Sequence, residues 1–302
     1  MVTDLRRIFS ALVTPMRDDE SIDVEVLREL VERQIARGVE GFYCCGSSGE
    51  ALLLSLDERS DVVRAVVDQV NGRVPVIAHV GTIRTRDAVS LARGAADAGV
   101  AAVSLIPPYY YNWTSDEVTR YYQTVLDAVP LPVLLYNIPQ FTRITFDKHT
   151  AGDLFGHERL LGMKHTSHDM YALERMTSAY PDKIFFNGFD EIYLSALAAG
   201  ATATVGTTVN LQVELFIRVR DAFARGDMAE ARRVQSQIND VVETLVAHGV
   251  FQSAKYLSGY DGVPTGPCRA PFRPLSAEDM AALDALRERL SDVIEQGDRL
   301  LE

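Results

Sequence analysis

The stretch GFYCCGSSGEALLLSLDER (residues 41–59) contains a complete passage from a strand to a helix. It begins with a run that is apolar on both faces, which is typical of a strand buried in a parallel sheet. A loop of glycine and serine follows, and then Ser55-x-x-Glu58 forms a capping box that marks a helix start. The stretch therefore predicts one strand–loop–helix unit, with small polar residues at the carboxyl end of the strand.

Similar units recur along the chain, where short apolar runs alternate with amphipathic stretches. The other runs are IFSALVT (8–14), VPVIAHV (74–80), AAVSLI (101–106), LPVLLYNI (131–138), LLGMKHT (160–166), KIFFNG (183–188) and ATATVGTT (201–208). Between the first two strands, residues 24–38 place Leu27, Leu30, Val31 and Ile35 on one helical face. Eight strands with intervening helices over about 225 residues predict an α/β fold, a (β/α)8 TIM barrel rather than a doubly wound sheet.

The last part of the chain has no strand pattern. Residues 227–249 and 276–301 follow helical periodicity, and the turn-rich segment VPTGPCRAPFRPL (263–275) lies between them. The sequence therefore predicts two parts: a catalytic barrel over residues 1–225 and a C-terminal helical extension over residues 226–302.

Composition limits the partners and the compartment. The net charge of -12 argues against nucleic acid and anionic membranes, because both require basic surfaces. No apolar stretch approaches the roughly 20 residues needed to cross a bilayer, and we expect no signal peptide. Cys44, Cys45 and Cys268 lack the spacing of a zinc or redox site, so we expect core thiols in a reducing cytoplasm. A small anionic substrate remains compatible with this charge.

The chemistry of a TIM barrel belongs at the carboxyl ends of its strands. The second strand ends in GSSGE (46–50), which has neither the lysine of a Walker loop nor the GxGxxG spacing. The hydroxyls of Ser47 and Ser48 and the free N–H groups of a compact turn suit one carboxylate. The alternative is a plain turn in which a serine caps the next helix.

Lys164 follows the apolar residues of the sixth strand and is expected to point into the barrel mouth. A buried lysine is costly without a partner, and its chemical use is a Schiff base formed by the neutral amine. At the unperturbed pKa of about 10.4, roughly 1 lysine in 2,500 is neutral at pH 7. Desolvation raises that neutral fraction. The alternative is a lysine whose ammonium group reaches the solvent at the rim.

Other strand ends supply further candidates. Tyr136 ends the strand next to that of Lys164, where its phenol could relay protons, although a tyrosine in a strand is more commonly core packing. The fourth strand runs into PPYYYNWT (107–114), whose tyrosines cannot all face one core and should line the mouth or an oligomer contact. Asp190 and Glu191 are expected at the start of a helix. Their carboxylates either complement the helix dipole or bind substrate. No His, Asp and Glu cluster has metal spacing, so we expect no metal.

Together, GSSGE, YNIP (136–139) and the strand-six lysine resemble the pyruvate-dependent class I aldolase family of dihydrodipicolinate synthase and N-acetylneuraminate lyase. The resemblance continues through further motifs over nearly the whole chain. These are LVTP (12–15), IAHVG (77–81), VFQSAK (250–255) and PCRAPF (267–272). The resemblance implies a (β/α)8 barrel with a C-terminal helical extension, a homotetramer built from tight dimers, and a mechanism that needs no cofactor.

The resemblance also implies roles for individual residues. Lys164 is expected to form an imine with the C2 carbonyl of a 2-keto acid, and Ser47 and Ser48 to bind the adjacent carboxylate. Tyr136 is expected to shuttle protons, assisted by Tyr110 of a neighbouring subunit.

The branch of the family is indicated by residues around the site. The dihydrodipicolinate synthases resemble a YNxPxRT pattern, in which the arginine helps to bind the carboxylate of the second substrate. Phe141 occupies the position of that arginine here, and a phenylalanine cannot form a charged pair with a carboxylate. KHTS (164–167), NGFDEI (187–192) and GVF (249–251) resemble the N-acetylneuraminate lyase branch instead. The residues then expected to bind the substrate tail are Thr166, Gly188, Asp190, Glu191, Thr207 and Phe251.

Several residues depart from that branch. Ser48 replaces a more usual threonine, Thr207 stands where serine is common, and His165 and His168 are bulkier than expected. The sequence predicts a lyase that cleaves a 2-keto acid to pyruvate and an aldehyde, with N-acetylneuraminate as the leading substrate. The alternatives are dihydrodipicolinate synthesis, an aldolase or dehydratase of 2-keto-3-deoxy sugar acids, and a non-catalytic keto-acid-binding regulator.

Overall fold

In the computed structural model, which describes residues 4–259 and 263–299, eight parallel strands close into a barrel in sequence order. The strands are β1 (Ile8–Ala11), β2 (Gly41–Cys44), β3 (Val76–His79), β4 (Ala102–Leu105), β5 (Val133–Asn137), β6 (Leu160–His165), β7 (Ile184–Asn187) and β8 (Ala203–Gly206). β1 pairs with both β2 and β8, which closes the sheet. Each apolar run predicted to be a strand contains one of these strands, so the TIM-barrel prediction is confirmed.

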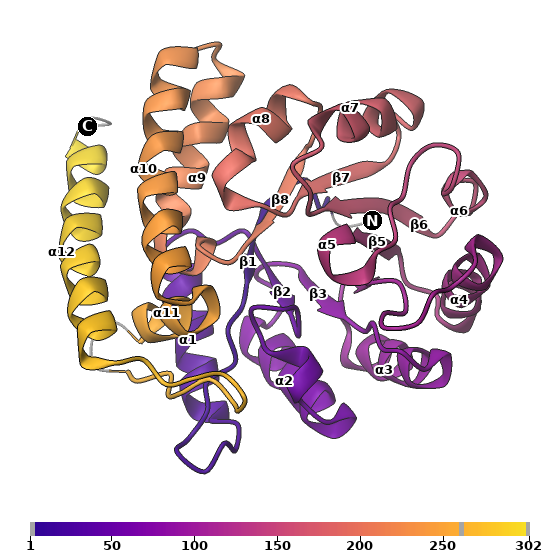
Figure 1. Ribbon diagram of the computed structural model, residues 1–302, viewed down its shortest axis with the longest axis horizontal. Coiled ribbons are helices and arrows are strands. Elements are labelled where there is room, and N and C mark those ends of the chain that lie inside the picture. Colours follow the sequence, from indigo (N-terminus) through magenta and orange to yellow (C-terminus); the bar gives the residue numbers. More distant parts are fainter. Residues whose placement is uncertain (1–3, 260–262, 300–302) are drawn as a thin grey trace.

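Helices surround the barrel, as Figure 1 shows. The longer ones are α1 (Val24–Ala36), α2 (Leu56–Val70), α3 (Thr85–Ala98), α4 (Ser115–Ala128), α7 (Met170–Ala179), α8 (Tyr193–Ala198) and α9 (Val209–Ala224). Short helical turns occupy the loops: η1 (Ala51–Leu53), α5 (Pro139–Thr142), α6 (Gly152–Phe155) and η2 (Asp190–Ile192). The predicted capping box is present at α2, where Ser55 accepts the N–H of Glu58 and its own N–H donates to the Glu58 carboxylate.

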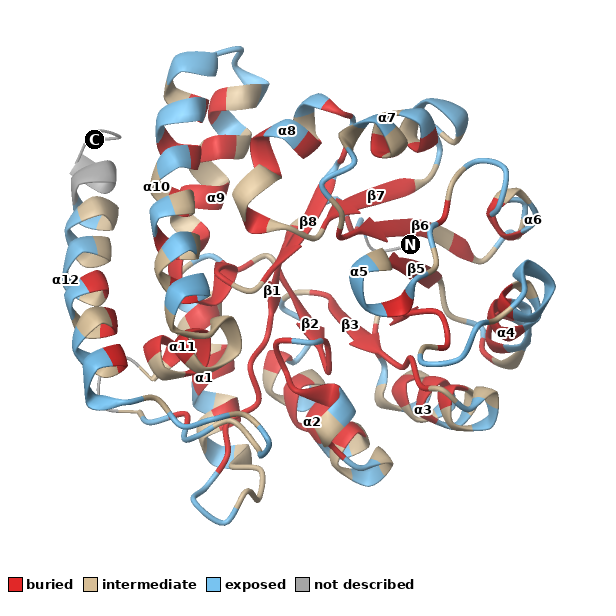
Figure 2. Cartoon of the chain, in the orientation of Figure 1, coloured by how far each residue is buried: buried red, intermediate tan, exposed pale blue. Residues whose placement is uncertain are grey.

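The strands are buried on both faces (Figure 2), which explains their continuously apolar sequences. Alternate residues point inward and fill the barrel, among them Phe9, Tyr43 and Phe186. Gly41 makes room for this filling, because a Cβ there would lie 2.4 Å from Cε1 of Phe9. The same alternation brings Tyr136 of β5 to the inside, near the carboxyl end of its strand.

The C-terminal region is helical, as predicted, and consists of α10 (Met228–His248), α11 (Val250–Ser258) and α12 (Ala277–Arg299). Figure 1 shows α10 between α9 and α12. A small apolar cluster joins these helices to the barrel: Leu211, Val241, Leu245, Ala254, Leu257, Leu283 and Leu286. The predicted boundary after residue 225 falls between α9 and α10 and stays a prediction.

Cys44 and Cys45 are buried in the core, as expected, and Cys268 is half-buried and free. Within residues 4–259 and 263–299, every helix is either too short or too polar to cross a membrane.

Candidate active site

Lys164 and Tyr136 lie side by side on neighbouring strands. The two residues are register partners in the β5–β6 pair, and they are 4% and 3% exposed. The Nζ of Lys164 lies 4.0 Å from the centroid of the Tyr136 ring and 4.5 Å from that of Tyr43. The lysine therefore points into the barrel mouth, as predicted, and its amine is held between two aromatic faces.

Both side chains line a cavity of about 310 Å³ at the carboxyl ends of the strands. The cavity is also lined by the other residues predicted to bind substrate: Ser47, Ser48, Thr166, Gly188, Asp190, Glu191, Thr207 and Phe251. These residues come from four strand ends and from α11, so the closed barrel is what brings them together. The structure thus assembles the predicted cavity, while the role of each residue stays a prediction.

The GSSGE loop turns sharply after β2. Its turn is held by N–H groups of Gly49 and Glu50, which donate to the carbonyls of Gly46 and Ser47. Within the described residues, no backbone carbonyl accepts the N–H of Ser47 or of Ser48. The N-cap of α2 is Ser55, so the alternative in which a loop serine caps that helix is wrong. The loop thus lines the cavity with residues whose N–H groups no backbone carbonyl accepts, an arrangement that suits an anion.

Ser48 and Thr207 connect the loop to the end of β8. Their hydroxyl oxygens lie 2.7 Å apart, and Ser48 is buried. The residues that depart from the lyase branch at these two positions therefore form one hydrogen-bonded pair. Ser47, by contrast, is exposed to the cavity.

Another part of the cavity wall is polar, and some of its polar atoms have no hydrogen-bond partner. The Oδ2 of Asp190 accepts the N–H of Thr208 at 2.7 Å, but its Oδ1 and the Oγ1 of Thr166 are buried without a hydrogen-bond partner. Burial raises the pKa of Asp190 to about 6. Gly188 packs closely against Thr166. A Cβ atom at residue 188 would lie 1.9 Å from the Oγ1 of Thr166, so there is no room for a larger residue. Buried polar atoms without a partner are unusual in a folded protein, so this wall is suited to a ligand with hydroxyl groups.

The two histidines near Lys164 have different environments. His165 points away from the cavity: its Nδ1 accepts from Asn137, and its Nε2 donates to the carbonyl of Asp169. Burial lowers the pKa of His165. His168 is exposed at the mouth, where its ring stacks on Phe189 at 4.7 Å and its Nε2 lies 3.3 Å from Oε1 of Glu191. Only the side chain of His168 therefore touches residues that line the cavity, whereas His165 contacts Gly188 through its backbone carbonyl.

A second cavity of about 580 Å³ adjoins the first, and Ser47, Phe141 and Phe251 line both. Its remaining walls are largely apolar, with Leu52, Leu53, Ile106, Tyr109, Pro271 and Phe272. Phe141 is exposed, and Phe251 packs edge-on against Phe272. Phe141 therefore places an apolar ring at the position where the synthase pattern has an arginine.

Tyr110 is not brought to the cavity by its own chain. It is 82% exposed, has a φ of +80°, and packs against Tyr111 on the surface. The expectation that these consecutive tyrosines do not all enter one core is confirmed. The contribution of Tyr110 across a subunit contact stays a prediction.

Two residues were missed by the sequence analysis. Tyr43 lies beside Lys164, and its hydroxyl donates to Ser104 at 2.9 Å; burial raises its pKa well above the ordinary value. His79 lines the second cavity, with its Nδ1 bonded to the carbonyl of Cys45 and its Nε2 accepting the N–H of Ile106. Burial lowers the pKa of His79 well below its usual value, so this imidazole is neutral. Strand alternation within GFYCC was the available signal for Tyr43.

Within residues 4–259 and 263–299, no three or more His, Cys, Asp or Glu side chains come close enough to hold a metal ion.

Comparisons with known proteins agree with the fold and the family resemblance. The N-acetylneuraminate lyase of Rhizobium meliloti (strain 1021) is 44% identical over 290 residues, which cover 96% of each chain. A crystal structure of CdNal from Clostridium difficile in complex with mannosamine has a TM-score of 0.93 at 31% identity, covering 95% of this chain and 100% of that one. A dihydrodipicolinate synthase structure from Bacillus anthracis has a TM-score of 0.90 at 26% identity, covering 94% of this chain and 98% of that one.

Residues 4–290 match the family described as the Dihydrodipicolinate synthetase family. This match covers the barrel and most of the extension, and it includes every residue predicted to lie in the site. The resemblance seen in the sequence motifs is therefore confirmed, and the chain belongs to the dihydrodipicolinate synthetase family.

Proposed function

We propose that this protein is a class I lyase that cleaves N-acetylneuraminate to N-acetylmannosamine and pyruvate through a Schiff base on Lys164. The observation that carries the proposal is the pairing of Lys164 with Tyr136 in the cavity that Ser47 and Ser48 also line. The relatives named N-acetylneuraminate lyase support the choice of substrate. Phe141 in place of an arginine disfavours the synthase reaction.

The first step is formation of the imine. The neutral amine of Lys164 attacks C2 of the 2-keto acid, the carbinolamine loses water, and a protonated imine forms. The free N–H groups of Ser47 and Ser48 and their hydroxyls hold the carboxylate next to C2. The aromatic faces of Tyr43 and Tyr136 keep the amine away from bulk water.

The second step is cleavage of the C3–C4 bond. Tyr136 accepts the proton of the C4 hydroxyl, directly or by relay, and C4 leaves as the aldehyde carbon. The bonding electrons move into the C2–C3 bond to give an enamine on Lys164. Protonation of C3 and hydrolysis of the imine then release pyruvate and restore the free amine.

The rest of the substrate lies against the polar wall. The Oδ1 of Asp190 and the Oγ1 of Thr166, which are buried and have no partner among the described residues, form hydrogen bonds with hydroxyl groups of the substrate. Glu191 and Thr207 add further acceptors and donors, and Phe251 packs against the carbon chain.

The proposal extends to the assembly and the compartment. We propose a homotetramer in the cytoplasm, in which the barrel of residues 1–225 is the catalytic part and Tyr110 completes a neighbouring site. Exposed Leu52, Tyr110 and Tyr111 line one surface hollow, and exposed apolar side chains of this kind mark subunit contacts. Native mass spectrometry of the purified chain tests the tetramer.

Borohydride reduction in the presence of pyruvate, followed by intact mass and peptide mapping, tests the imine. A stable pyruvyl adduct on Lys164 is expected. Product analysis with N-acetylneuraminate, with 2-keto-3-deoxy sugar acids, and with pyruvate plus aspartate semialdehyde then identifies the reaction. A folded protein that binds pyruvate but forms no adduct would be a keto-acid-binding regulator, and the lyase proposal would be abandoned.

A further inference from the structure

A buried ion pair joins the carboxylate-binding loop to the C-terminal extension. The Nζ of Lys255 in α11 lies 2.8 Å from Oε1 of Glu50, 205 residues away in the sequence. Their side chains are 1% and 0% exposed. Charges so deeply buried are costly even when paired, and apolar residues of similar volume commonly replace such pairs without loss of stability. Stability alone is therefore a poor explanation for this pair.

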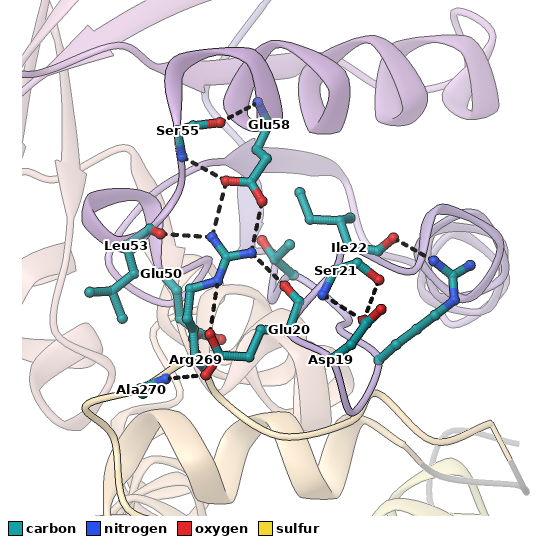
Figure 3. Close-up of polar contacts among 12 residues, drawn as sticks. Asp19, Glu20, Ser21, Ile22, Glu50, Leu53, Ser55, Glu58, Arg269 and Ala270 are labelled. Carbon is teal, nitrogen blue, oxygen red and sulfur yellow. Dashed lines mark hydrogen bonds and ion pairs between the residues drawn. The ribbon is translucent and has the colours of Figure 1, made fainter.

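The second oxygen of Glu50 binds the extension at another point. Oε2 accepts the backbone N–H of Arg269 at 2.7 Å, and Figure 3 shows these residues side by side. The Arg269 guanidinium then donates to both oxygens of Glu58 and, at 2.8 Å, to the carbonyl of Leu53. Arg269 beside Glu58 lowers the pKa of that carboxyl to about 2, so both partners are charged at neutral pH. The connection from β2 to α2 is thus fastened to residues 255 and 269 at several atoms.

Both ends of the ion pair are close to the candidate site. Glu50 follows Ser48 by two residues, and its N–H donates to the carbonyl of Ser47 at 3.1 Å. Its φ of +57° is in the left-handed region, an unusual conformation for a residue other than glycine, so other contacts must hold it. Lys255 follows Phe251 by one helical turn, which places both side chains on the same side of α11.

From these contacts we propose that the Glu50–Lys255 pair is a positioning device, which fixes the carboxylate-binding loop of the barrel relative to the Phe251 wall of the extension. The inference rests on the proposed function, because it takes Ser47 and Ser48 as the carboxylate site. Neither Glu50 nor Lys255 takes part in the imine chemistry. The pair acts through the geometry of the loop, and so it sets the affinity for the 2-keto carboxylate rather than the rate of bond cleavage.

The test compares two double variants of the full chain. Glu50→Gln/Lys255→Met removes both charges with little change in volume. Glu40→Gln/Arg220→Met is the control for the loss of an ion pair away from the cavity. Glu40 accepts from Arg220 at 2.8 Å and from the N–H of Ile8 at the amino ends of the strands, and this pair is more exposed than Glu50–Lys255. The single variants Glu50→Gln and Lys255→Met each leave one buried charge without its counter-charge. Both singles should therefore melt at a lower temperature than the Glu50–Lys255 double variant.

The readouts separate positioning from folding. In the Glu50–Lys255 double variant, we expect the KM for the 2-keto acid and the half-saturating pyruvate concentration for borohydride trapping to rise about tenfold, with kcat within about twofold. The control should change neither value by more than about twofold. Hydrogen exchange of the backbone amides in residues 46–54 should be faster in the double variant and unchanged in the control.

Each result has a defined consequence. If KM, trapping and amide exchange all match the wild-type protein, or if losses appear only in the single variants, the positioning role is wrong. If wild-type protein traps no pyruvate, the proposed function fails on its own. Amide exchange then decides whether the pair still fixes the loop, because that measurement needs no substrate.

Discussion

The amine of Lys164 lies 4.0 Å above the ring of Tyr136, its register partner on the adjacent strand. The pairing is a direct consequence of the barrel, because parallel strands of fixed register bring residues at their carboxyl ends to the same height. The tyrosine ring is therefore a wall of the amine pocket, while its hydroxyl is a separate chemical group. The two contributions can be removed independently.

Replacing Lys164 with alanine removes the amine on which the proposed mechanism depends. We expect kcat to fall by about 10³ or more and the borohydride adduct to disappear. Steady-state cleavage of N-acetylneuraminate and intact mass measure the two effects. Lys148→Ala, at an exposed lysine outside the cavity, is the control and should keep both. Substantial turnover in Lys164→Ala would rule out the imine mechanism.

Replacing Tyr136 with phenylalanine keeps the ring beside Lys164 and removes the hydroxyl. We expect trapping of pyruvate to persist, because the amine pocket is intact, while kcat falls by about 10² to 10⁴ through loss of the proton relay. Parallel trapping and steady-state assays check this split. An unchanged kcat would assign the proton transfer to another group, such as Tyr43 or a tyrosine of a neighbouring subunit.

Much of the site could be predicted from the sequence because local patterns encode it. The eight strands follow from short apolar runs, and the rule that barrel chemistry lies at strand ends selects Lys164, Tyr136 and Ser47. Strand alternation also predicts the direction of the residue that follows Lys164. Because Lys164 points inward, the next residue, His165, must point outward, as the structure shows.

Other features have no local pattern. The contact between Glu50 and Lys255 spans 205 residues, and nothing near either residue marks its partner. The stacking of His168 on Phe189 depends on how two loops fold over the mouth. Tyr110, as proposed, contacts the site of another subunit. The fold of a single chain therefore does not show which residues Tyr110 contacts.

Asp190 predicts a pH dependence of stability. Burial raises its pKa from 3.8 to about 6, so the folded state holds this proton more tightly than the unfolded state. The contribution of Asp190 to stability therefore falls as the pH rises from about 4 to about 6, and it stays lost at higher pH. Asn has no proton to lose over this range, so between pH 4 and pH 7 the stability of Asp190→Asn relative to wild type should rise by about 2 kcal/mol. Urea unfolding of both proteins at fixed concentration measures this difference. If the difference in the free energy of unfolding between wild type and Asp190→Asn is the same at pH 4 and at pH 7, the pKa of Asp190 is not raised.

His168 predicts an effect confined to the substrate tail. Its Nε2 lies 3.3 Å from Glu191, so the imidazole competes with substrate hydroxyls for that carboxylate. Exposed pairs of this kind contribute about 0.2–1 kcal/mol, so His168→Ala should lower the KM for N-acetylneuraminate by up to about fivefold. Trapping of pyruvate, which has no tail, should stay unchanged, as should both values in the control His149→Ala at an exposed loop position. A higher KM in His168→Ala would mean that the imidazole itself binds the tail, and Glu191 would then be the residue that orients it.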